Sequence, residues 1–566
     1  MKELPCVLPE HLQVRSNQTQ WRPILITLLT YWVLVMGMWG MFSLDRGLTF
    51  ETGFPVACQK SLHDCLVYGD SLRPYNSLFL GLGHLLGKGN GSYVTYQLLY
   101  GFLWWGRGVL TFLIFRRIWS AYPIVGFLVG ALVIVHASDG ALNWIGQLHQ
   151  FGFMFCLVLA VYLLLEGWQT DNKILSFSFL IASLFPLYIS LWTYESQYFI
   201  ILSVPLILFA LHPKLTPRLL FTTAIWYILP AIYGYLQLEK YLVAKVSNYQ
   251  TSVVRPDLSS TAIFKDLGTH LGHSLQFWHW AETLPVYGVA LLAPVVAGVC
   301  VIAFIVGSHL LSLGFPSLRL PPVSHLIVSL GFGLLLLVLS FPVYLLLAGN
   351  TTFWRTQMLS GFGAAIVLGS VFLLVAKLLM KDRYQALLAI TACSIVVFAG
   401  VNGGMKFQGF HEYRWQIHRN LMAQISHLLP DVENHTLILL TNLPKEYSHD
   451  PFGAAMWFDF PTQLLYPTKE VVGYFIYEKG DQPKDNPWRF TAKGMEWEKK
   501  GMGQDFTEVS YNQIVALRYE LDGKISILDK FPANLLPQKF DVSGYAPYSR
   551  IRRDFITNRS IRIFSR

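Results

Sequence analysis

Long apolar segments separated by short polar ones run through most of this chain. A transmembrane helix needs roughly 20 mostly apolar residues. The first segment is too long for the apolar core of a cleavable signal peptide and lacks a small-x-small site, so it is predicted to remain as a span. Eleven segments are predicted to span a membrane: 23–42, 94–115, 122–137, 143–166, 175–193, 197–212, 217–236, 285–308, 324–347, 358–379 and 385–402.

Charged residues are scarce and unevenly placed along the chain. Only 14% of the 566 residues are charged, whereas soluble domains hold about 25%. Residues 401–566 contain 40 of the 77 charged residues, and the first 400 residues contain 37. The sequence therefore predicts a polytopic α-helical membrane domain over 1–403 and a soluble C-terminal domain over 404–566.

Strand patterns in the tail indicate the class of this second domain. The stretch 435–444 has the pattern of a buried strand followed by a turn, and 470–481 has a strand pattern. The stretch 510–530 predicts two strands joined at Asp522–Gly523. We expect a small α/β domain.

The distribution of Lys and Arg predicts the orientation of the spans. If the short apolar stretch 75–88 is an interfacial or re-entrant helix rather than a span, the short loops on one side collect most of the cations, which marks that side as cytoplasmic. The N-terminus is then cytoplasmic, and the outer loops 43–93 and 237–284 and the C-terminal domain are extracytoplasmic. The chain is expected in the plasma membrane, or the inner membrane of a bacterium. The net charge of +9 is attributed to the loops of the membrane domain rather than to a surface that binds nucleic acid, because the positive and negative charges of the tail nearly cancel.

Acidic residues number fifteen in the first 400 positions, and several gather at the predicted outer face. Asp45, Glu51 and Asp70 lie in the first outer loop, and Glu195 lies between the fifth and sixth spans. A carboxylate beside an apolar surface can accept a proton from an attacking hydroxyl. The alternative is that each residue is a solvated loop residue or a helix cap.

Cationic groups on the same face are candidates for binding a phosphate, through Arg73, His136, Arg255 and Arg355. Glu195 is grouped with these donor-binding residues. The alternative for the arginines is anchoring at the membrane interface by snorkelling.

Cysteine and metal patterns add little to the prediction. Cys58 and Cys65 share the first outer loop and either form a disulfide or remain free thiols. The sequence contains no metal motif and no P-loop. No cofactor is expected, and dependence on a divalent metal is left open.

Three stretches carry a resemblance to a known family. Residues 73–118 are similar to the run of arginine–proline, amphipathic helix, second span and Arg-Arg in the GT-C membrane glycosyltransferases, which include protein O-mannosyltransferases and lipid A aminoarabinose transferases. Residues 136–155 and 192–200 resemble the hairpin and span end that follow in that family. The similarity covers roughly residues 20–212, whereas the later spans and the tail match only in layout.

The resemblance implies a GT-C-like fold and a reaction. The donor would be a sugar on a polyprenyl phosphate, and the acceptor a hydroxyl of a lipid, glycan or protein at the extracytoplasmic face, within membrane lipids. By position, Asp45 matches the family's catalytic base in an inverting reaction, and Arg73 and Glu195 match the arginine–proline and the later acid. Many relatives have two adjacent acids where this chain has Asp45–Arg46, so Glu51 and Asp70 remain alternatives for the base.

Two other functions are compatible with the sequence. A transporter or flippase for a lipid-linked glycan predicts internal repeats and broken helices at the membrane midplane, and no clear repeat is seen. A non-catalytic assembly protein would use the tail for docking. The clustering of acids at one face favours the glycosyltransferase over the transporter, whereas the nearly neutral, mixed tail leaves the assembly protein open.

Overall fold

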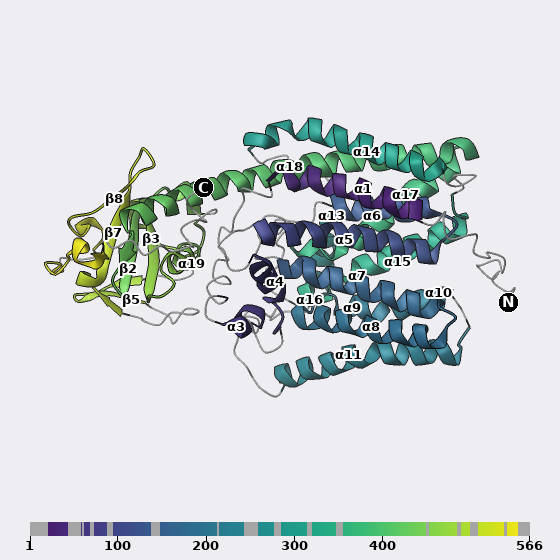
Figure 1. Ribbon diagram of the computed structural model, residues 1–566, viewed down its shortest axis with the longest axis horizontal. Helices are drawn as coiled ribbons and strands as arrows, with labels where there is room; N and C mark the ends of the chain where they lie inside the picture. The colour runs from purple at the N-terminus through teal and green to yellow at the C-terminus, as the bar shows by residue number, and fades with distance from the viewer. Residues whose placement is uncertain are drawn as a thin grey trace.

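The computed structural model consists of a helical bundle joined to a smaller α/β domain (Figure 1). It describes residues 21–42, 58, 61–67, 73–87, 94–136, 148–211, 214–242, 259–276, 285–313, 320–346, 355–448, 452–483, 488–497, 508–536 and 540–552. The end of the bundle next to the α/β domain is called the proximal end below, and the opposite end the distal end.

The bundle confirms the predicted polytopic membrane fold. Nine helices among the described residues are long and apolar enough to cross a membrane, and two further apolar helices, over 123–135 and 198–211, are shorter. These eleven segments correspond to the eleven predicted from the sequence. The helices of the bundle are α1 (Trp21–Met38), α5 (Val94–Ile118), α6 (Pro123–Val135), α7 (Leu148–Gln169), α8 (Lys173–Thr193), α9 (Tyr198–Ser203), α10 (Pro205–Leu211), α11 (Pro217–Leu242), α14 (Ala293–Leu313), α15 (Val323–Leu339), α16 (Pro342–Leu345), α17 (Ser360–Leu379) and α18 (Asp382–Leu428).

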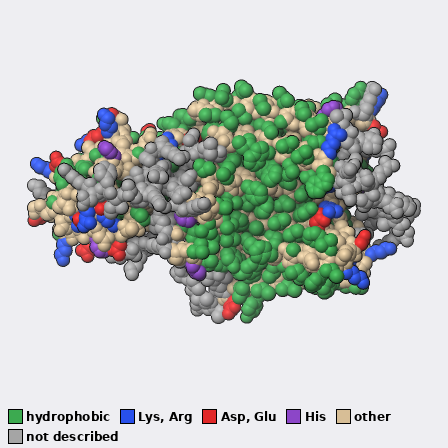
Figure 2. Space-filling view, viewed as in Figure 1, with side chains coloured by type: hydrophobic (Ala, Val, Ile, Leu, Met, Phe, Trp, Pro, Cys, Tyr) green, Lys and Arg blue, Asp and Glu red, His purple; other side chains and the backbone are tan. Residues whose placement is uncertain are grey.

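A band of apolar side chains covers the visible face of the bundle, and Lys and Arg side chains lie at its distal edge (Figure 2). The exposed apolar residues include Leu25 on α1, Phe185 on α8 and Ile302 on α14. Apolar surface of this extent is costly in water and is typical of a protein surrounded by lipid.

Helix α6 lies at the centre of the bundle, and all of its residues are buried. A helix that is apolar on every side has no face for water. Its approach to α5 is close, because a Cβ atom on Gly130 would lie 2.8 Å from the carbonyl oxygen of Gly108. Small residues permit such contact between membrane helices, and the Tyr31 hydroxyl on α1 donates a hydrogen bond to the carbonyl of Phe127 at 2.7 Å.

The two predicted outer loops contain short helices at the proximal end. The first holds α3 (Leu62–Leu66) and α4 (Leu78–Leu86), and the second holds α13 (Ser260–Ser274). Helix α4 has nine residues, too few to span a bilayer, with Leu82 and Leu86 exposed on one side and Phe79 buried on the other. The length of this helix agrees with the prediction that 75–88 does not span the membrane.

Helix α18 connects the two parts of the protein. Its 47 residues correspond to about 70 Å, more than twice the roughly 30 Å of a bilayer core. It passes through the bundle and continues into the α/β domain (Figure 1), so the predicted boundary after residue 403 falls inside it. Near its end, the Gln424 side chain donates to the carbonyl of Gly523 at 3.0 Å and accepts from the amide of Ile525 at 2.9 Å.

The α/β domain is built on a four-stranded sheet in the order β3-β2-β7-β8. Strands β2 and β3 are parallel and are connected through α19, β2 and β7 are also parallel, and β8 is antiparallel to β7. The three predicted strand regions are confirmed, including the turn at Gly523, which has a φ of +80°. The elements are β1 (Asp431–Val432), β2 (Thr436–Leu443), α19 (Met456–Leu465), β3 (Val471–Tyr477), β4 (Trp488–Phe490), β5 (Gly494–Trp497), β6 (Glu508–Ser510), β7 (Ile514–Tyr519), β8 (Ile525–Ile527) and β9 (Ile551–Arg552).

Candidate functional site

The structure describes the side chains of three of the eight predicted site residues. These are Arg73, His136 and Glu195. For Arg355 the backbone is described, at the start of a short 3-10 helix (Arg355–Gln357), but the side chain is not. The other four, Asp45, Glu51, Asp70 and Arg255, lie outside the described residues.

Arg73 and Glu195 form an ion pair at the proximal end, although 122 residues separate them in the chain. The Arg73 Nε donates to Glu195 Oε2 at 2.6 Å, and Nη2 donates to Oε1. The Arg73 and Glu195 side chains are 20% and 22% exposed. The pair therefore lies at the edge of the bundle, where it is partly desolvated and still reachable.

An aromatic ring supports the guanidinium group. The Arg73 Cζ atom lies 4.5 Å from the centroid of the Tyr194 ring, a cation–π distance. Burial disfavours the Arg73 charge, but the neighbouring Glu195 carboxylate and Tyr194 outweigh it and raise the pKa of Arg73 above its usual value. Arg73 therefore carries its charge throughout the physiological pH range.

Two local structures bring Arg73 to Glu195. After Arg73 the chain turns, and the amide of Tyr75 donates to the carbonyl of Trp192 at 3.3 Å. The hydroxyls of Tyr75 and Tyr188 are 3.3 Å apart. Both contacts are made with the last turns of α8, which immediately precede the turn that contains Glu195. They therefore hold the segment after Arg73 next to Glu195.

The turn between α8 and α9 is held by a buried amide. The Gln197 Nε2 donates to the carbonyl of Tyr194 at 2.6 Å and to the carbonyl of Ser190 at 2.8 Å. The amide of Tyr198 donates to the carbonyl of Glu195 at 3.0 Å and closes the turn. The Glu195 carboxylate therefore projects from a rigid turn.

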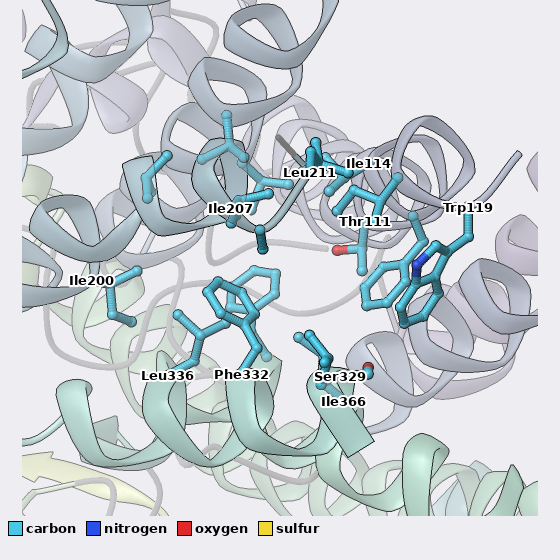
Figure 3. Close-up of a pocket in the computed structure, with 18 of the residues that line it drawn as sticks. Thr111, Ile114, Trp119, Ile200, Ile207, Leu211, Ser329, Phe332, Leu336 and Ile366 are labelled. Carbon is cyan, nitrogen blue, oxygen red and sulfur yellow. The ribbon is translucent and has the colours of Figure 1, made fainter. Parts of the chain in front are cut away.

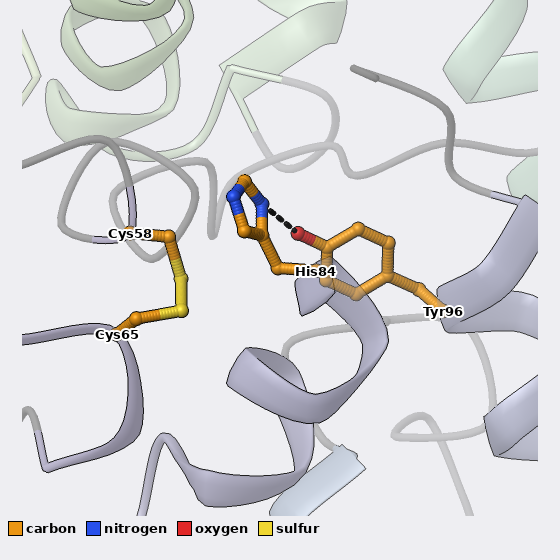
Figure 4. Close-up of a disulfide and its surroundings, with 4 residues drawn as sticks. All are labelled: Cys58, Cys65, His84 and Tyr96. Carbon is orange, nitrogen blue, oxygen red and sulfur yellow. Dashed lines mark hydrogen bonds between the residues drawn. A yellow bond between two sulfur atoms is a disulfide. The ribbon is translucent and has the colours of Figure 1, made fainter. Parts of the chain in front are cut away.

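The other described parts of the first outer loop, at Cys58 and over 61–67 and 76–87, lie at the same end of the bundle (Figure 4). Cys58 and Cys65 form a disulfide, so the disulfide alternative left open by the sequence is the one observed. His84 Nδ1 lies 3.1 Å from the hydroxyl of Tyr96, and burial lowers the pKa of His84 below its usual value. A Cβ atom on Gly152 would lie 2.1 Å from the Phe79 ring, which shows how closely α4 packs on α7.

His136 lies in a separate, buried cluster. It is 3% exposed, and its Nε2 donates to the carbonyl of Ser274 at 2.8 Å. The Ser274 and Ser360 hydroxyls are 2.7 Å apart, and the Gln357 side chain donates to His270 Nδ1 at 3.1 Å. The cluster joins the ends of α6, α13 and α17, and the predicted donor-binding role of His136 stays a prediction.

Several residues of the site, and one ion pair outside it, were missed by sequence reasoning. Tyr194 and Tyr188 precede Glu195 in an aromatic-rich span end, and only spatial proximity shows that they support Arg73 and Tyr75. A second ion pair, between Arg117 and Glu166, lies at the distal end. The signal for this pair in the sequence was the position of Glu166, an acidic residue at the end of a mostly apolar span.

The arrangement of Arg73 at this site is suited to binding an anionic group. Arginine presents its donors in a planar fork that suits carboxylate and phosphate oxygens. A guanidinium fixed in orientation at a membrane edge can bind the phosphate of a lipid whose chain remains in the bilayer. The described residues contain no group of three His, Cys, Asp or Glu side chains that could hold a metal ion.

Comparison with known proteins finds a likeness among solved structures and no match in sequence. No protein-family model and no curated protein sequence matches the chain. Among solved structures, the chain is similar to the crystal structure of ArnT from Cupriavidus metallidurans in the apo state, with 14% sequence identity and a TM-score of 0.38. The match covers 82% of this chain and 87% of that chain. ArnT is a lipid A aminoarabinose transferase with the GT-C fold.

Proposed function

We propose that this protein is a membrane glycosyltransferase that transfers a sugar from a polyprenyl-phosphate donor to an acceptor hydroxyl at its extracytoplasmic face. The observation that carries the proposal is the Arg73–Glu195 ion pair. It holds the partly exposed guanidinium group of Arg73 in a fixed orientation at the edge of the apolar bundle. A lipid-linked donor has its phosphate at this depth, because the chain stays in the hydrocarbon and the charged group stays outside it.

The proposed reaction inverts the anomeric centre. The acceptor hydroxyl oxygen forms a bond to the anomeric carbon while the bond from that carbon to the phosphate oxygen breaks. The hydroxyl proton passes to a carboxylate of the first outer loop, with Asp45 as the first candidate and Glu51 and Asp70 as alternatives. The electron pair leaves with polyprenyl phosphate, and Arg73 stabilises its negative charge.

A disulfide and the distribution of charged residues support an extracytoplasmic reaction. The disulfide between Cys58 and Cys65 belongs to the same loop as the predicted base. Disulfides persist in oxidising compartments and are rare in the cytosol. This agrees with the charge distribution, which predicts that the proximal end and the α/β domain face outward.

The test measures release of polyprenyl phosphate by purified protein in nanodiscs, with a panel of polyprenyl-phosphate sugars and acceptors. We expect release by the wild-type protein and its loss in Asp45→Asn, Glu51→Gln or Asp70→Asn. Asp382→Asn is the matched control, because Asp382 is a carboxylate at the distal end, where it accepts from Gln385 at 3.1 Å. Equal release by all variants would exclude a base in the first loop.

A transport assay separates this proposal from the flippase alternative. Vesicles carry a fluorescent lipid-linked sugar, and an impermeant reductant reports which leaflet it occupies. Movement of the intact lipid-linked sugar between leaflets without release of polyprenyl phosphate would identify a transporter and refute the transferase.

A further inference from the structure

A second feature of the bundle lies apart from the Arg73–Glu195 pair. A cavity of about 320 Å³ is enclosed by α5, α7, α9, α10, α15 and α17 (Figure 3). Its walls are almost wholly apolar, with Ile114, Leu157, Ile200 and Phe332 among them. A buried water needs about two to four polar partners, and apolar cavities hold hydrocarbon instead.

The cavity opens toward lipid rather than toward water. Two of its lining residues are exposed, Val328 on α15 (55%) and Ala210 on α10. Their neighbours Ile327 and Phe209 are also exposed, at 56% and 44%, and both helices belong to the apolar segments of the bundle. A chain from the surrounding bilayer can therefore enter between α10 and α15.

The length of the cavity corresponds to one leaflet. Its lining on α15 extends from His325 to Leu336, which is about 16 Å along a helix at 1.5 Å per residue. The hydrocarbon core of a bilayer is roughly 30 Å thick, so one leaflet contributes about half of that. An acyl chain of one leaflet matches this length, whereas a much longer polyprenyl chain exceeds it.

The polar groups of the cavity identify the end that receives a headgroup. Thr111 and Ser329 have hydroxyls already hydrogen-bonded within the bundle. His325, in the first turn of α15, has a buried Nδ1 with no hydrogen-bond partner among the described residues. Its ring lies 6.2 Å from that of Trp119, which also lines the cavity. Both residues are at the distal end. Because ring N–H groups of His and Trp donate hydrogen bonds to oxygen atoms, we expect the oxygen-rich headgroup of a lipid at that end.

Among the cations at the same end of the bundle are Lys377 and Arg116. Lys377, in the last turn of α17, donates to the carbonyl of Leu320 just before α15. Arg116 is in the last turn of α5, beside the lining residue Phe115, and makes no ion pair with any described residue. In the same helix end, Arg117 forms an ion pair with Glu166. The local charge therefore favours an anionic headgroup.

We propose that this cavity binds one acyl chain of an anionic phospholipid from the leaflet at the distal end, with the headgroup near His325 and Trp119. This site is distinct from the donor site, whose phosphate is proposed to lie at the proximal end beside Arg73. The proposal does not depend on the proposed transferase activity.

The test reconstitutes the full-length protein in nanodiscs with phosphatidylglycerol that carries a photoreactive group on one acyl chain. After illumination, labelled peptides are identified by mass spectrometry. We expect labels on α5, α10 and α15. Val328→Trp should lower labelling about tenfold by filling the entrance. Ile327→Trp is the matched control, because it places the same bulk on the neighbouring, equally exposed position outside the cavity lining.

The charge preference is tested with the same probe on phosphatidylcholine. We expect the wild-type protein to be labelled more strongly by phosphatidylglycerol, and the double variant Arg116→Gln and Lys377→Gln to lose that preference while labelling by the chain remains. Equal labelling of Val328→Trp and Ile327→Trp would overturn the proposal. Labelling of these helices by a photoreactive polyprenyl phosphate and not by phospholipid would assign the cavity to the donor and would also overturn it.

Discussion

Replacing Glu195 with Gln removes one negative charge and keeps the size of the side chain. If Arg73 binds the donor phosphate, the orientation that Glu195 imposes on it matters for turnover. The chain contains its own control in Glu166, which forms the same kind of two-bond pair with Arg117 at the distal end. Glu195→Gln and Glu166→Gln are therefore the same chemical change at opposite ends of the bundle.

The two changes are expected to cost similar stability and different activity. Two unit charges about 4 Å apart attract by about 4 kcal/mol at an effective dielectric constant of 20. Solvent reaches both pairs, since the side chains are 20% and 22% exposed at the proximal end and 44% and 10% at the distal end. The net loss of folding free energy is therefore about 1–3 kcal/mol for each variant.

Turnover is expected to separate the variants. Loss of a positioned donor to a developing oxyanion lowers kcat by about 10²-fold or more, and we expect about 10²-fold for Glu195→Gln. Glu166→Gln should stay within about threefold of the wild type, the effect of roughly 0.5 kcal/mol. The assay is the rate of polyprenyl-phosphate release in nanodiscs, with thermal melting measured on the same samples.

One result would refute the reasoning directly. If Glu195→Gln melts like the wild type and releases polyprenyl phosphate at the wild-type rate, the pair neither orients a phosphate-binding group nor supports the proximal end. If both variants lose activity in proportion to melting temperature, the Arg73–Glu195 pair is a structural feature only.

Three further outcomes are expected. The double variant Cys58→Ser and Cys65→Ser should destabilise the first loop by about 2.5 kcal/mol through lost loop closure. In intact cells an impermeant maleimide should label the wild-type pair only after reduction, and labelling without reductant would contradict the disulfide. Gly152→Ala should push the Phe79 ring off α7 and speed hydrogen exchange in α4; unchanged exchange would show that α4 adapts. Gln424→Ala should weaken attachment of the β7–β8 turn to α18 by about 1–2 kcal/mol, seen as faster proteolysis at that turn, whereas unchanged proteolysis would show that apolar packing alone holds it.

The number and order of the spans could be read from the sequence, because spanning a bilayer requires about 20 apolar residues in a row. Eleven segments were predicted, and the described residues contain eleven apolar helical segments, nine long and two short. The strands of the α/β domain were predictable for a similar reason, since runs such as Thr436–Leu443 are apolar and end in turn residues. The length of α18 was not predictable, because its polar second half is stabilised by contacts with the α/β domain rather than by local apolar pattern.

The site was predictable only as a set of candidates. Loop charge placed Arg73 and Glu195 on one face of the membrane, but nothing local joins residues 122 positions apart. Their pairing depends on the tertiary contacts between the Tyr75 segment and the end of α8, and on the turn that Gln197 holds.

The membrane class of this protein follows from its sequence, since hydrophobicity and charge act residue by residue and decide what enters a membrane. The pairing of charges, the burial of His136 and the cavity between the helices follow instead from the way the segments pack together. These properties depend on distances between segments that are remote in the chain, and no periodicity within one segment encodes them.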